Sequence, residues 1–280
     1  MKLLDGKEVK LKMLDDLKKD VDALDCKLGL TVIQVGEDPA STVYVGQKNK
    51  MASNMGFNFN HVKLSENVTE EEILTLINKL NNDDMIDGIL VQMPIPYHLD
   101  AKKIQNAISP YKDVDGLTDI NMGKLSHNIP SLVPCTPMGI VDLLDYYQID
   151  IEGKNVVIVG RSDLVGKPLA ALMINRNATV TLCHSKTKDL RHYTKNADIL
   201  VAALGKAKTF KKEDIKKGSI IIDVGINRLD DGKLYGDVDF DDVKDKVSYI
   251  TPVPGGVGQM TVAELGYNTY KAHMLRCNNK

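Results

Sequence analysis

Several features that would single out a class of protein are missing from this 280-residue chain. Basic residues do not outnumber acidic ones, because 36 Lys and Arg stand against 38 Asp and Glu, for a net charge of −2. A protein that binds nucleic acid by neutralising phosphates needs a basic surface, so we expect no nucleic-acid partner. Glycine (21) and proline (10) are also too few for a disordered or collagen-like chain.

Long apolar runs and paired cysteines are missing as well. The longest apolar stretches, such as Ile199 to Leu204, are far shorter than the about 20 residues that a membrane-spanning helix needs. The N-terminal segment MKLLDGKEVK lacks the apolar stretch of a secretory signal. The four cysteines form no CxxC pair, and the six histidines lack metal-ligand spacing. We therefore expect a cytoplasmic protein with reduced thiols, no metal site and no membrane partner.

The composition that is present is typical of a globular protein, with 43% hydrophobic and 26% charged residues. At about 150 residues per domain, the length predicts roughly two domains. Apolar runs alternate with amphipathic segments, and strands that alternate with helices form parallel sheets. We expect strands at 28–35, 61–64, 88–93, 155–159, 178–183, 198–203, 219–224 and 247–250, and helices at 9–24, 40–55, 69–80, 139–147, 167–176 and 261–275.

Two of the expected helices have recognisable end signals. Asp38 or Ser41 can cap the N-terminus of the helix over 40–55, and Gly56 can end it. Thr69 is followed by three glutamates, which is the arrangement of a capping box. These signals support both helix predictions.

A glycine turn follows the apolar strand over 155–159. Gly160 begins the turn and Gly166 ends it, just before an expected helix, and a nucleotide-binding α/β domain bends its backbone against a pyrophosphate at this point. The match to G-x-G-x-x-G is imperfect, because Ser162 replaces the second glycine and the last glycine is displaced by one. The alternative is that both glycines only permit a tight turn between strand and helix. The strand before and the helix after favour nucleotide binding.

The end of the following strand indicates which dinucleotide would bind. An NAD enzyme has an acidic residue there, about 20 residues after the glycine turn, to bind the ribose 2′-hydroxyl. This chain has Ser185 and Lys186 instead, and Arg161 lies in the turn. A cationic site with hydrogen-bond donors suits a 2′-phosphate, so we predict NADP as cofactor. A solvated loop lysine is an equally good interpretation of Lys186 alone.

Tyr44 and Lys48 are the first candidate catalytic pair. They are four residues apart on an expected helix, so both side chains project from one face. A lysine in a partly desolvated site has its pKa lowered towards neutrality and can then act as an acid or a base. An ordinary surface pair, with a half-buried tyrosine, explains the spacing at least as well.

Gln92 and the acidic loop after residue 111 are candidates for binding a polar ring. Gln92 lies in the apolar run GILVQM, where an amide costs free energy unless both of its ends are hydrogen-bonded. Asp113 and Asp115 are two apart, and either could bind a ring amine or amide. Structural explanations stay open for both: a satisfied strand-end glutamine, and a turn that favours Asp and Gly for backbone reasons.

The segment TPVPGGVG at 251–258 combines two prolines with three glycines. Proline fixes φ, and glycine lets backbone N–H groups approach a ligand closely. The segment follows a short strand and leads into the helix expected to start at Thr261. It is either a loop that clamps a ligand or a linker between domains.

Taken together, these segments resemble one known family. The chain is similar to the bifunctional methylenetetrahydrofolate dehydrogenase/methenyltetrahydrofolate cyclohydrolase family, whose motifs occur here in the family's order and span nearly the whole sequence. The matching motifs are YVGQK at 44–48, LVQMP at 90–94, KDVDGLT at 112–118, PCTP at 134–137, GRS at 160–162, VGKP at 165–168, HSKT at 184–187 and ITPVPGGVG at 250–258.

The resemblance implies a fold and a domain organisation. It implies a two-lobed α/β protein with an N-terminal α/β substrate domain and a Rossmann-like NADP-binding domain built on a parallel sheet. We expect residues 1–136, with the C-terminal helix 262–280, to form the folate-binding catalytic domain. Residues 137–261 would form the NADP-binding domain. The family also implies a homodimer.

The resemblance further assigns roles to single residues. It makes Lys48 the catalytic lysine and Tyr44 the neighbour that positions it, with Gln92 and Asp115 holding the pterin ring and counted with the catalytic residues. The substrate would also contact Val91, Met93, Pro254, Gly255, Gly256, Val257 and Gly258, and NADP would contact Gly160, Arg161, Ser162, Ser185 and Ile226.

The implied chemistry has two steps in one-carbon metabolism, which supplies purine biosynthesis. Hydride leaves the methylene bridge of 5,10-methylenetetrahydrofolate, and water then opens the resulting methenyl ring to give 10-formyltetrahydrofolate. The first step needs two rings at near-attack distance, and the second needs proton transfers, for which Lys48 is the candidate. One departure is Gln259, where the family usually has proline. Its backbone N–H and flexibility are expected to loosen the folate loop and to alter the relative rates of the two activities.

Two other interpretations compete with this one. Short-chain dehydrogenases also use Tyr-x-x-x-Lys, but there the pair follows the glycine turn, whereas Tyr44 and Lys48 precede Gly160 by more than 100 positions. A sensor that binds folate or NADP without catalysis is the non-enzymatic alternative. It has no need of a proton-transfer lysine. Formation of NADPH from methylenetetrahydrofolate and NADP distinguishes the enzyme from both.

Overall fold

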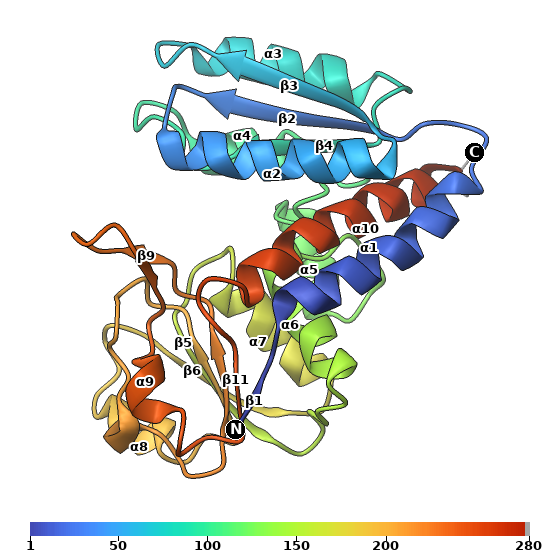
Figure 1. Cartoon of the computed structure of the whole chain (residues 1–280). Helices are drawn as coiled ribbons and strands as arrows, with labels where there is room; N and C mark the ends of the chain where they lie inside the picture. Colours follow the sequence, from blue (N-terminus) through green and yellow to red (C-terminus); the bar gives the residue numbers. More distant parts are fainter. Residues whose placement is uncertain (278–280) are drawn as a thin grey trace. The chain divides into compact units, whose positions relative to one another are not determined.

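The computed structural model describes residues 1–277, and in it the chain forms two compact units (Figure 1). One unit contains residues 1–11 and 136–261, and the other contains residues 12–135 together with the chain from 262 onward. The first eleven residues, which we expected in the domain of the catalytic lysine, thus belong to the unit of the glycine turn. The reason is that β1 (Lys2–Leu3) pairs with β11 (Tyr249–Ile250). We refer to the unit of residues 136–261 as the nucleotide unit and to the other as the lysine unit.

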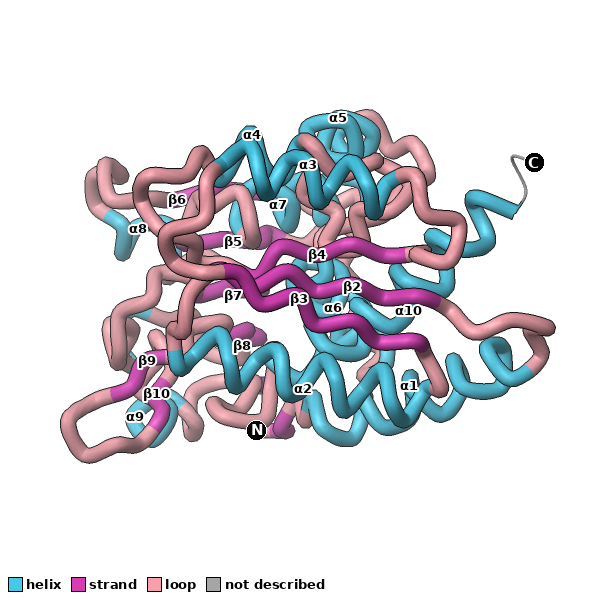
Figure 2. Tube along the Cα trace, turned by 90° about the horizontal axis from the view of Figure 1, so that it is seen from above, coloured by secondary structure: helices cyan, strands magenta, loops and turns pink. Residues whose placement is uncertain are grey.

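The lysine unit is built on a three-stranded parallel sheet, visible in Figure 2. The strand order is β3 (Asn58–Leu64), β2 (Gly29–Val35) and β4 (Gly88–Gln92). Every residue of β2 and β4 is buried, as expected for apolar strands covered on both faces, whereas the edge strand β3 is mostly exposed. Low apolar content explains why only the end of β3, from residue 61, was predicted.

Helices cover both faces of this sheet. On one face, Leu30 and Leu90 pack in a cluster with residues of α1 (Gly6–Asp22), α2 (Pro39–Met55) and α10 (Val257–Cys277). On the other face, Ile33 and Ile89 pack with α3 (Glu70–Asn81) and α4 (Ala101–Asn106). A further helix, α5 (Asp119–Ser126), follows the acidic loop.

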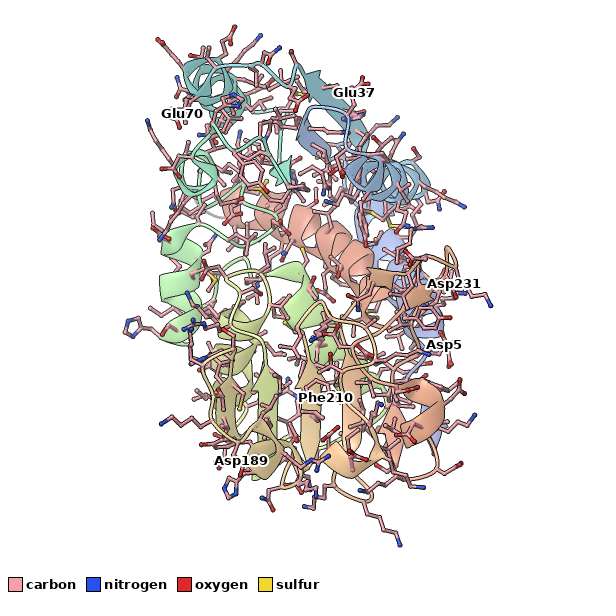
Figure 3. All side chains as sticks on the ribbon, turned by 90° about the vertical axis from the view of Figure 1, so that its left-hand side faces the viewer. Asp5, Glu37, Glu70, Asp189, Phe210 and Asp231 are labelled. Atoms are coloured by element: carbon pink, nitrogen blue, oxygen red, sulfur yellow. The ribbon has the colours of Figure 1, made fainter. Side chains whose placement is uncertain are left out.

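Both predicted helix starts in this unit are confirmed. Asp38, one of the two proposed caps, is the N-cap of α2 and accepts a hydrogen bond from the Ser41 backbone N–H at 2.7 Å. Thr69 and Glu72 form the capping box of α3, in which each side chain accepts from the other residue's backbone N–H. Figure 3 labels Glu37, which follows β2 and precedes the cap Asp38, and Glu70, the first residue of α3.

The nucleotide unit has a six-stranded sheet in which every pairing is parallel, as predicted. The strand order is β1, β11, β8 (Ile220–Asp223), β7 (Ile199–Ala202), β5 (Asn155–Val159) and β6 (Thr179–Cys183). Its other elements are α6 (Cys135–Tyr146), α7 (Gly166–Asn175), α8 (Leu190–Thr194), α9 (Phe240–Val243) and the small ribbon of β9 (Asn227–Arg228) and β10 (Leu234–Tyr235).

One core cluster of the nucleotide unit lies against one face of this sheet, and strand residues that point to the other face, such as Ile158 and Val201, are also buried. Val157, Leu200 and Ile221 from three neighbouring strands pack in one cluster with Phe210. Figure 3 shows Phe210 among the strands of this unit, whereas Asp189 lies at its periphery, where it caps α8. Apolar burial of this kind is the main free energy that holds the strands together.

Two helices begin four residues earlier than the sequence patterns predicted. Helix α6 starts at Cys135 rather than 139, because Pro137 falls in its first turn, where proline is tolerated. Helix α10 starts at Val257 rather than 261, because nothing in Gly258 or Gln259 stops a helix once the prolines have ended. None of the helices in residues 1–277 is both long and apolar enough to cross a membrane.

Candidate functional site

Lys48 and Gln92 meet in the lysine unit. Lys48 projects from α2, and its Nζ donates a hydrogen bond to Oε1 of Gln92 at 2.8 Å. Gln92 is the last residue of β4, and its Nε2 donates to the backbone carbonyl of Met93 at 2.7 Å. Both ends of the buried amide are therefore satisfied, and one of its two partners is the candidate catalytic amine.

The environment of Lys48 favours its neutral form. Burial lowers the pKa of the Lys48 ammonium, and the negative charge of Asp115 acts in the opposite direction. A lysine with a lowered pKa has a larger fraction of free amine near neutral pH, and only the free amine can accept a proton. The lowered pKa expected from the sequence is thus present, and the hydrogen bond of Nζ is made with Gln92 rather than with Tyr44.

The two acidic residues of the loop have different surroundings. Asp113 is completely buried and accepts hydrogen bonds from the Thr118 backbone N–H, from Asn121 Nδ2 and from Gln105 Nε2. Asp115 is half-buried, burial raises its pKa, and Lys48 is the charge that lowers it again. Asp113 therefore builds the loop, and Asp115 is electrostatically coupled to Lys48.

Lys112, just before these carboxylates, is also held by the fold. Its Nζ donates to the backbone carbonyls of Leu80 at 2.9 Å and Asp83 at 2.7 Å, and only 4% of the residue is exposed. Burial lowers the pKa of this lysine too. The hydrogen bonds of Lys112 and Asp113 thus anchor the part of the loop that directly precedes Asp115.

The sequence analysis missed two residues that contact the acidic loop at Val114. Cys135 is buried, and its thiol donates to the Val114 carbonyl at 3.3 Å, while Asp115 and Lys48 both act on its pKa, which burial raises strongly. Asn268 of α10 donates from Nδ2 to the carbonyls of Val114 and Val133. The motif PCTP gave a signal for Cys135, but no local pattern connects residue 268 with residue 114.

The other predicted substrate contacts of this unit are less uniform. Tyr44 lies one turn before Lys48 on α2 and is exposed. Val91 is buried in the core cluster of the sheet. Met93 is half-buried, and its carbonyl accepts from Gln92. Their contacts with a substrate stay predictions.

The segment Pro254–Gly258 belongs to the nucleotide unit. Pro254 is exposed, Gly255 and Gly256 are buried, and Val257 and Gly258 form the first turn of α10. The backbone N–H of Gln259 donates to the Gly256 carbonyl at 3.1 Å. The N–H that the expected proline would lack is therefore used within the helix, which argues against the loosening that we expected at this position.

The glycine turn of the nucleotide unit is built by close backbone approach. A Cβ on Gly160 would lie 2.2 Å from the Ala203 carbonyl oxygen, and one on Gly166 would lie 1.9 Å from the Gly160 carbonyl oxygen. The tight-turn explanation therefore accounts for both glycines by itself. Helix α7 begins there with no side-chain cap at Val165 and no acidic residue in its first turn. An uncapped helix N-terminus of this kind suits a phosphate.

The other residues predicted for the cofactor lie within this turn or after two further strands of the same sheet. Arg161 and Ser162 are exposed within it, and the Ser162 hydroxyl accepts from the Val165 backbone N–H at 3.2 Å. Ser185 is exposed after β6, and Ile226 is exposed after β8. All four follow the carboxyl ends of parallel strands, which is where ligands bind in open α/β sheets.

Two buried carboxylates organise the loops at the same strand ends. Asp237 accepts from the backbone N–H groups of Leu204, Gly205 and Lys206, which follow β7. Asp223, the last residue of β8, accepts from the backbone N–H groups of Gly225, Asp237 and Val238. Burial raises the pKa of Asp223 to about 7. These residues escaped the sequence analysis, because their partners are backbone groups of distant segments.

Comparison with known proteins places this architecture in a family. The model of the tetrahydrofolate dehydrogenase/cyclohydrolase catalytic domain matches residues 4–115, and the model of the NAD(P)-binding domain of the same family matches residues 134–277. The chain belongs to the tetrahydrofolate dehydrogenase/cyclohydrolase family. Within residues 1–277, no group of three or more His, Cys, Asp or Glu side chains is arranged to hold a metal ion.

Relatives of this family match along the whole chain. The bifunctional protein FolD of Campylobacter concisus is 52% identical over 276 residues, which is 97% of each chain. The crystal structure of the bifunctional enzyme FolD, a methylenetetrahydrofolate dehydrogenase/cyclohydrolase from Campylobacter jejuni, has a TM-score of 0.96 at 46% identity over 99% of both chains. The crystal structure of the Trypanosoma brucei methylenetetrahydrofolate dehydrogenase-cyclohydrolase, complexed with NADP cofactor and inhibitor, has a TM-score of 0.93 at 36% identity. The match covers 98% of this chain and 97% of that one.

Proposed function

We propose that this protein oxidises 5,10-methylenetetrahydrofolate to 5,10-methenyltetrahydrofolate with NADP and hydrolyses the product to 10-formyltetrahydrofolate. Membership of the tetrahydrofolate dehydrogenase/cyclohydrolase family supports the reaction class. The observation that supports catalysis by this chain is the buried amine of Lys48, hydrogen-bonded to Gln92 and coupled to Asp115. A protein that only bound folate would gain nothing from a lysine with a lowered pKa.

Lys48 acts in the hydrolytic step. Water attacks the methenyl carbon, and the free amine of Lys48 takes the proton that this water loses. The neutral amine also avoids placing a second positive charge beside the methenyl cation, whereas the carboxylate of Asp115 attracts it. Gln92 holds Nζ in place, and we assign Gln92 and Asp115 to the hydrogen-bonding edge of the pterin ring, with Tyr44 as the positioning neighbour.

The nucleotide unit fits a dinucleotide. The uncapped start of α7 and the close backbone turn of Gly160 and Gly166 suit a pyrophosphate, and exposed Arg161 and Ser185 suit a 2′-phosphate. Ser162 and Ile226 complete the predicted contacts. NADP supplies, when bound, a nicotinamide ring that accepts the hydride. The residues of the chain bind and orient it and exclude water from the rings.

The decisive experiment is an assay of both half-reactions. Mixing the protein with methylenetetrahydrofolate and NADP should produce NADPH, seen by its near-ultraviolet absorbance, and added methenyltetrahydrofolate should disappear faster than in buffer. Absence of both signals would overturn the proposal, and NADPH formation without hydrolysis would reduce it to a dehydrogenase.

Cofactor preference is tested by replacing Arg161 and Ser185 with alanine. The double variant should raise the KM for NADP at least about tenfold, because two groups assigned to the 2′-phosphate are lost, and should hardly change the KM for NAD. Thr187→Ala, two residues after Ser185, removes a hydroxyl that accepts from the His184 backbone N–H and is a control for effects of the loop conformation alone. Equal losses with both cofactors would contradict the assignment to the 2′-phosphate.

The proposal includes a homodimer in the cytoplasm, with no nucleic-acid or membrane partner. The four free cysteines fit a reducing compartment. Light scattering across a concentration series gives the mass in solution. A monomeric mass at all concentrations would remove the dimer from the proposal and leave the reaction untouched.

A further inference from the structure

A second cluster of reactive side chains lies in the lysine unit. Its hydrogen bonds join residues other than Lys48, Gln92 and Asp115. Cys26 follows α1, and Cys277 ends α10. His273 lies between them: its Nε2 is 3.4 Å from the Cys277 sulfur and 3.7 Å from the Cys26 sulfur. Figure 1 shows the C-terminal end of α10 beside the connection from α1 to β2.

The other side of the imidazole is held by a carboxylate. Nδ1 of His273 is 3.0 Å from Oδ1 of Asp87, which also accepts from Arg276 at 2.9 Å. Oδ2 of Asp87 accepts from the Gly29 backbone N–H at 2.8 Å, so the carboxylate is fixed by the fold. A carboxylate at Nδ1 selects the tautomer with the proton on that nitrogen. The lone pair of Nε2 then faces the two thiols.

A carboxylate, an imidazole and a thiol in this order form the arrangement that activates a cysteine. Here the arrangement ends on two thiols instead of one, and both are exposed, whereas Cys135 and Cys183 are buried. Two thiols that share one base and are open to solvent can react with a small oxidant and then with each other. We propose that Cys26 and Cys277 form a disulfide bond when the protein meets a hydroperoxide, with His273 as the base.

The two thiols have different parts in the reaction. Partial desolvation of the sulfur and the charge of Asp87 raise the pKa of Cys26, and its sulfur is the more distant one from Nε2. Cys277 is therefore the attacking thiol. Nε2 takes its proton, the sulfur attacks one peroxide oxygen, and the oxygen–oxygen bond breaks. The departing hydroxide takes the proton back and leaves as water, and Cys277 is left as a sulfenic acid.

Cys26 completes the reaction. Its proton passes to Nε2, its sulfur attacks the sulfur of Cys277, and the sulfur–oxygen bond breaks to release a second water. With hydrogen peroxide as the hydroperoxide, two thiols are thus oxidised to one disulfide while one peroxide molecule is reduced to two water molecules. The last turn of a helix frays easily, which gives Cys277 the freedom that disulfide geometry requires. The bond would tie the end of α10, which also carries Asn268, to the segment after α1.

The charges around His273 come from three segments. Asp25 lies beside Cys26, Asp84 and Asp87 lie in the turn before β4, and Arg276 lies on α10 itself. The oxidation rate should rise with pH, because the thiolate is the form of cysteine that attacks a peroxide. Replacing His273 should change how steeply the rate rises with pH.

The experiment uses the full-length protein, reduced, freed of reductant and kept in a chelator so that trace metals do not catalyse oxidation. Before oxidation, a thiol reagent should titrate two thiols in the native protein and four after unfolding. Equimolar hydrogen peroxide should remove the two native thiols together and lower the mass by two hydrogen atoms. Peptide mapping should join residues 26 and 277, dithiothreitol should reverse the change, and the midpoint of thermal unfolding should rise by several degrees.

Variants separate the roles of the three side chains. Cys26→Ser should stop at a sulfenic acid on Cys277 that reacts with dimedone, and His273→Asn should slow the loss of thiols at least about tenfold and flatten its pH dependence. His127→Asn, at an exposed histidine of the same unit, is the matched control. The proposal is overturned if oxidised wild-type protein keeps both thiols, if it forms only disulfides between chains, or if His273→Asn and His127→Asn oxidise at the same rate.

Discussion

The charge at Lys48 and the charges at Asp223 and Asp237, in the other unit, are buried in different ways. In the lysine unit, the partner of the Lys48 ammonium is the amide of a side chain, Gln92, and the nearby charge is that of a half-buried Asp115. In the nucleotide unit, Asp223 and Asp237 are buried among backbone N–H groups. A charge held by side chains can gain or lose a proton without moving the backbone, whereas a charge held by backbone groups fixes loops in place. The first arrangement serves chemistry and the second serves positioning.

The largest expected effect is on the charge that does chemistry. Lys48→Met should reduce cyclohydrolase turnover about 10³-fold or more, because no base is left for the attacking water, while folate still binds. Turnover is measured as the decay of methenyltetrahydrofolate absorbance, and binding by equilibrium titration. Lys50→Met, at an exposed lysine of the same helix, should keep full activity. Wild-type hydrolysis by Lys48→Met would exclude Lys48 from the mechanism.

The next effect tests whether backbone-held charge is structural. Asp237→Ala leaves the N–H groups of three consecutive residues, Leu204 to Lys206, without their acceptor and should lower the free energy of unfolding by about 3 kcal/mol. Urea unfolding measures this change. Asp241→Ala, at an exposed carboxylate of α9, should cost less than about 0.5 kcal/mol. Similar stabilities for the two variants would show that the backbone-held carboxylate of Asp237 has no special structural role.

A third comparison uses the two carboxylates of one loop. Asp115→Asn should raise the KM for folate about tenfold. It should also shift the acid limb of the cyclohydrolase pH profile to lower pH, because the charge that raises the Lys48 pKa is gone. Asp113→Asn should instead lower stability by about 2 kcal/mol and leave the KM unchanged, since its carboxylate is fully buried and accepts hydrogen bonds from Thr118 and Asn121. An unchanged KM in Asp115→Asn would return that residue to a turn role.

The last effect is gradual, because it appears as a slope of stability against pH. The folded-state pKa of Asp223 is about 7, well above the value of 3.8 for an unperturbed Asp, so the folded protein binds its proton more tightly than the unfolded chain does. The stabilisation is complete below about pH 4 and is lost as pH rises to about 7, by at most about 1.4 kcal/mol per pH unit. Asp223→Asn should be less stable overall and lack this slope in urea unfolding between pH 5 and 7. A wild-type slope in the variant would assign the pH dependence to other groups.

Local patterns were enough for much of the fold. The strand over 155–159 has the predicted bounds, and the capping box at Thr69 and Glu72 is in place, because both depend on neighbours within a few residues. The parallel sheets followed from the alternation of strands and helices. The edge strand β3 was predicted too short, since a half-exposed strand lacks the apolar run by which buried strands are recognised.

The candidate site was predictable only in part. Motifs pointed to Lys48, Gln92 and Asp115, and the structure adds the hydrogen bond and the pKa shift that connect them. Asn268 was invisible, because its contact with Val114 joins residues 154 positions apart. Asp237 was invisible for the same reason, because its partners lie at residues 204 to 206. By itself, a carboxylate in a loop usually indicates a turn. Long-range contacts of this kind leave no periodic trace in a sequence.

Because Lys112 is anchored, proteolysis at this residue can report on local unfolding of the acidic loop. Trypsin needs an extended, accessible lysine, and the Nζ of Lys112 is engaged by the carbonyls of Leu80 and Asp83. Cleavage between residues 112 and 113 should therefore occur only from molecules in which the loop has locally unfolded. The rate of that single cut, followed with and without folate, would measure how far ligand binding suppresses such openings.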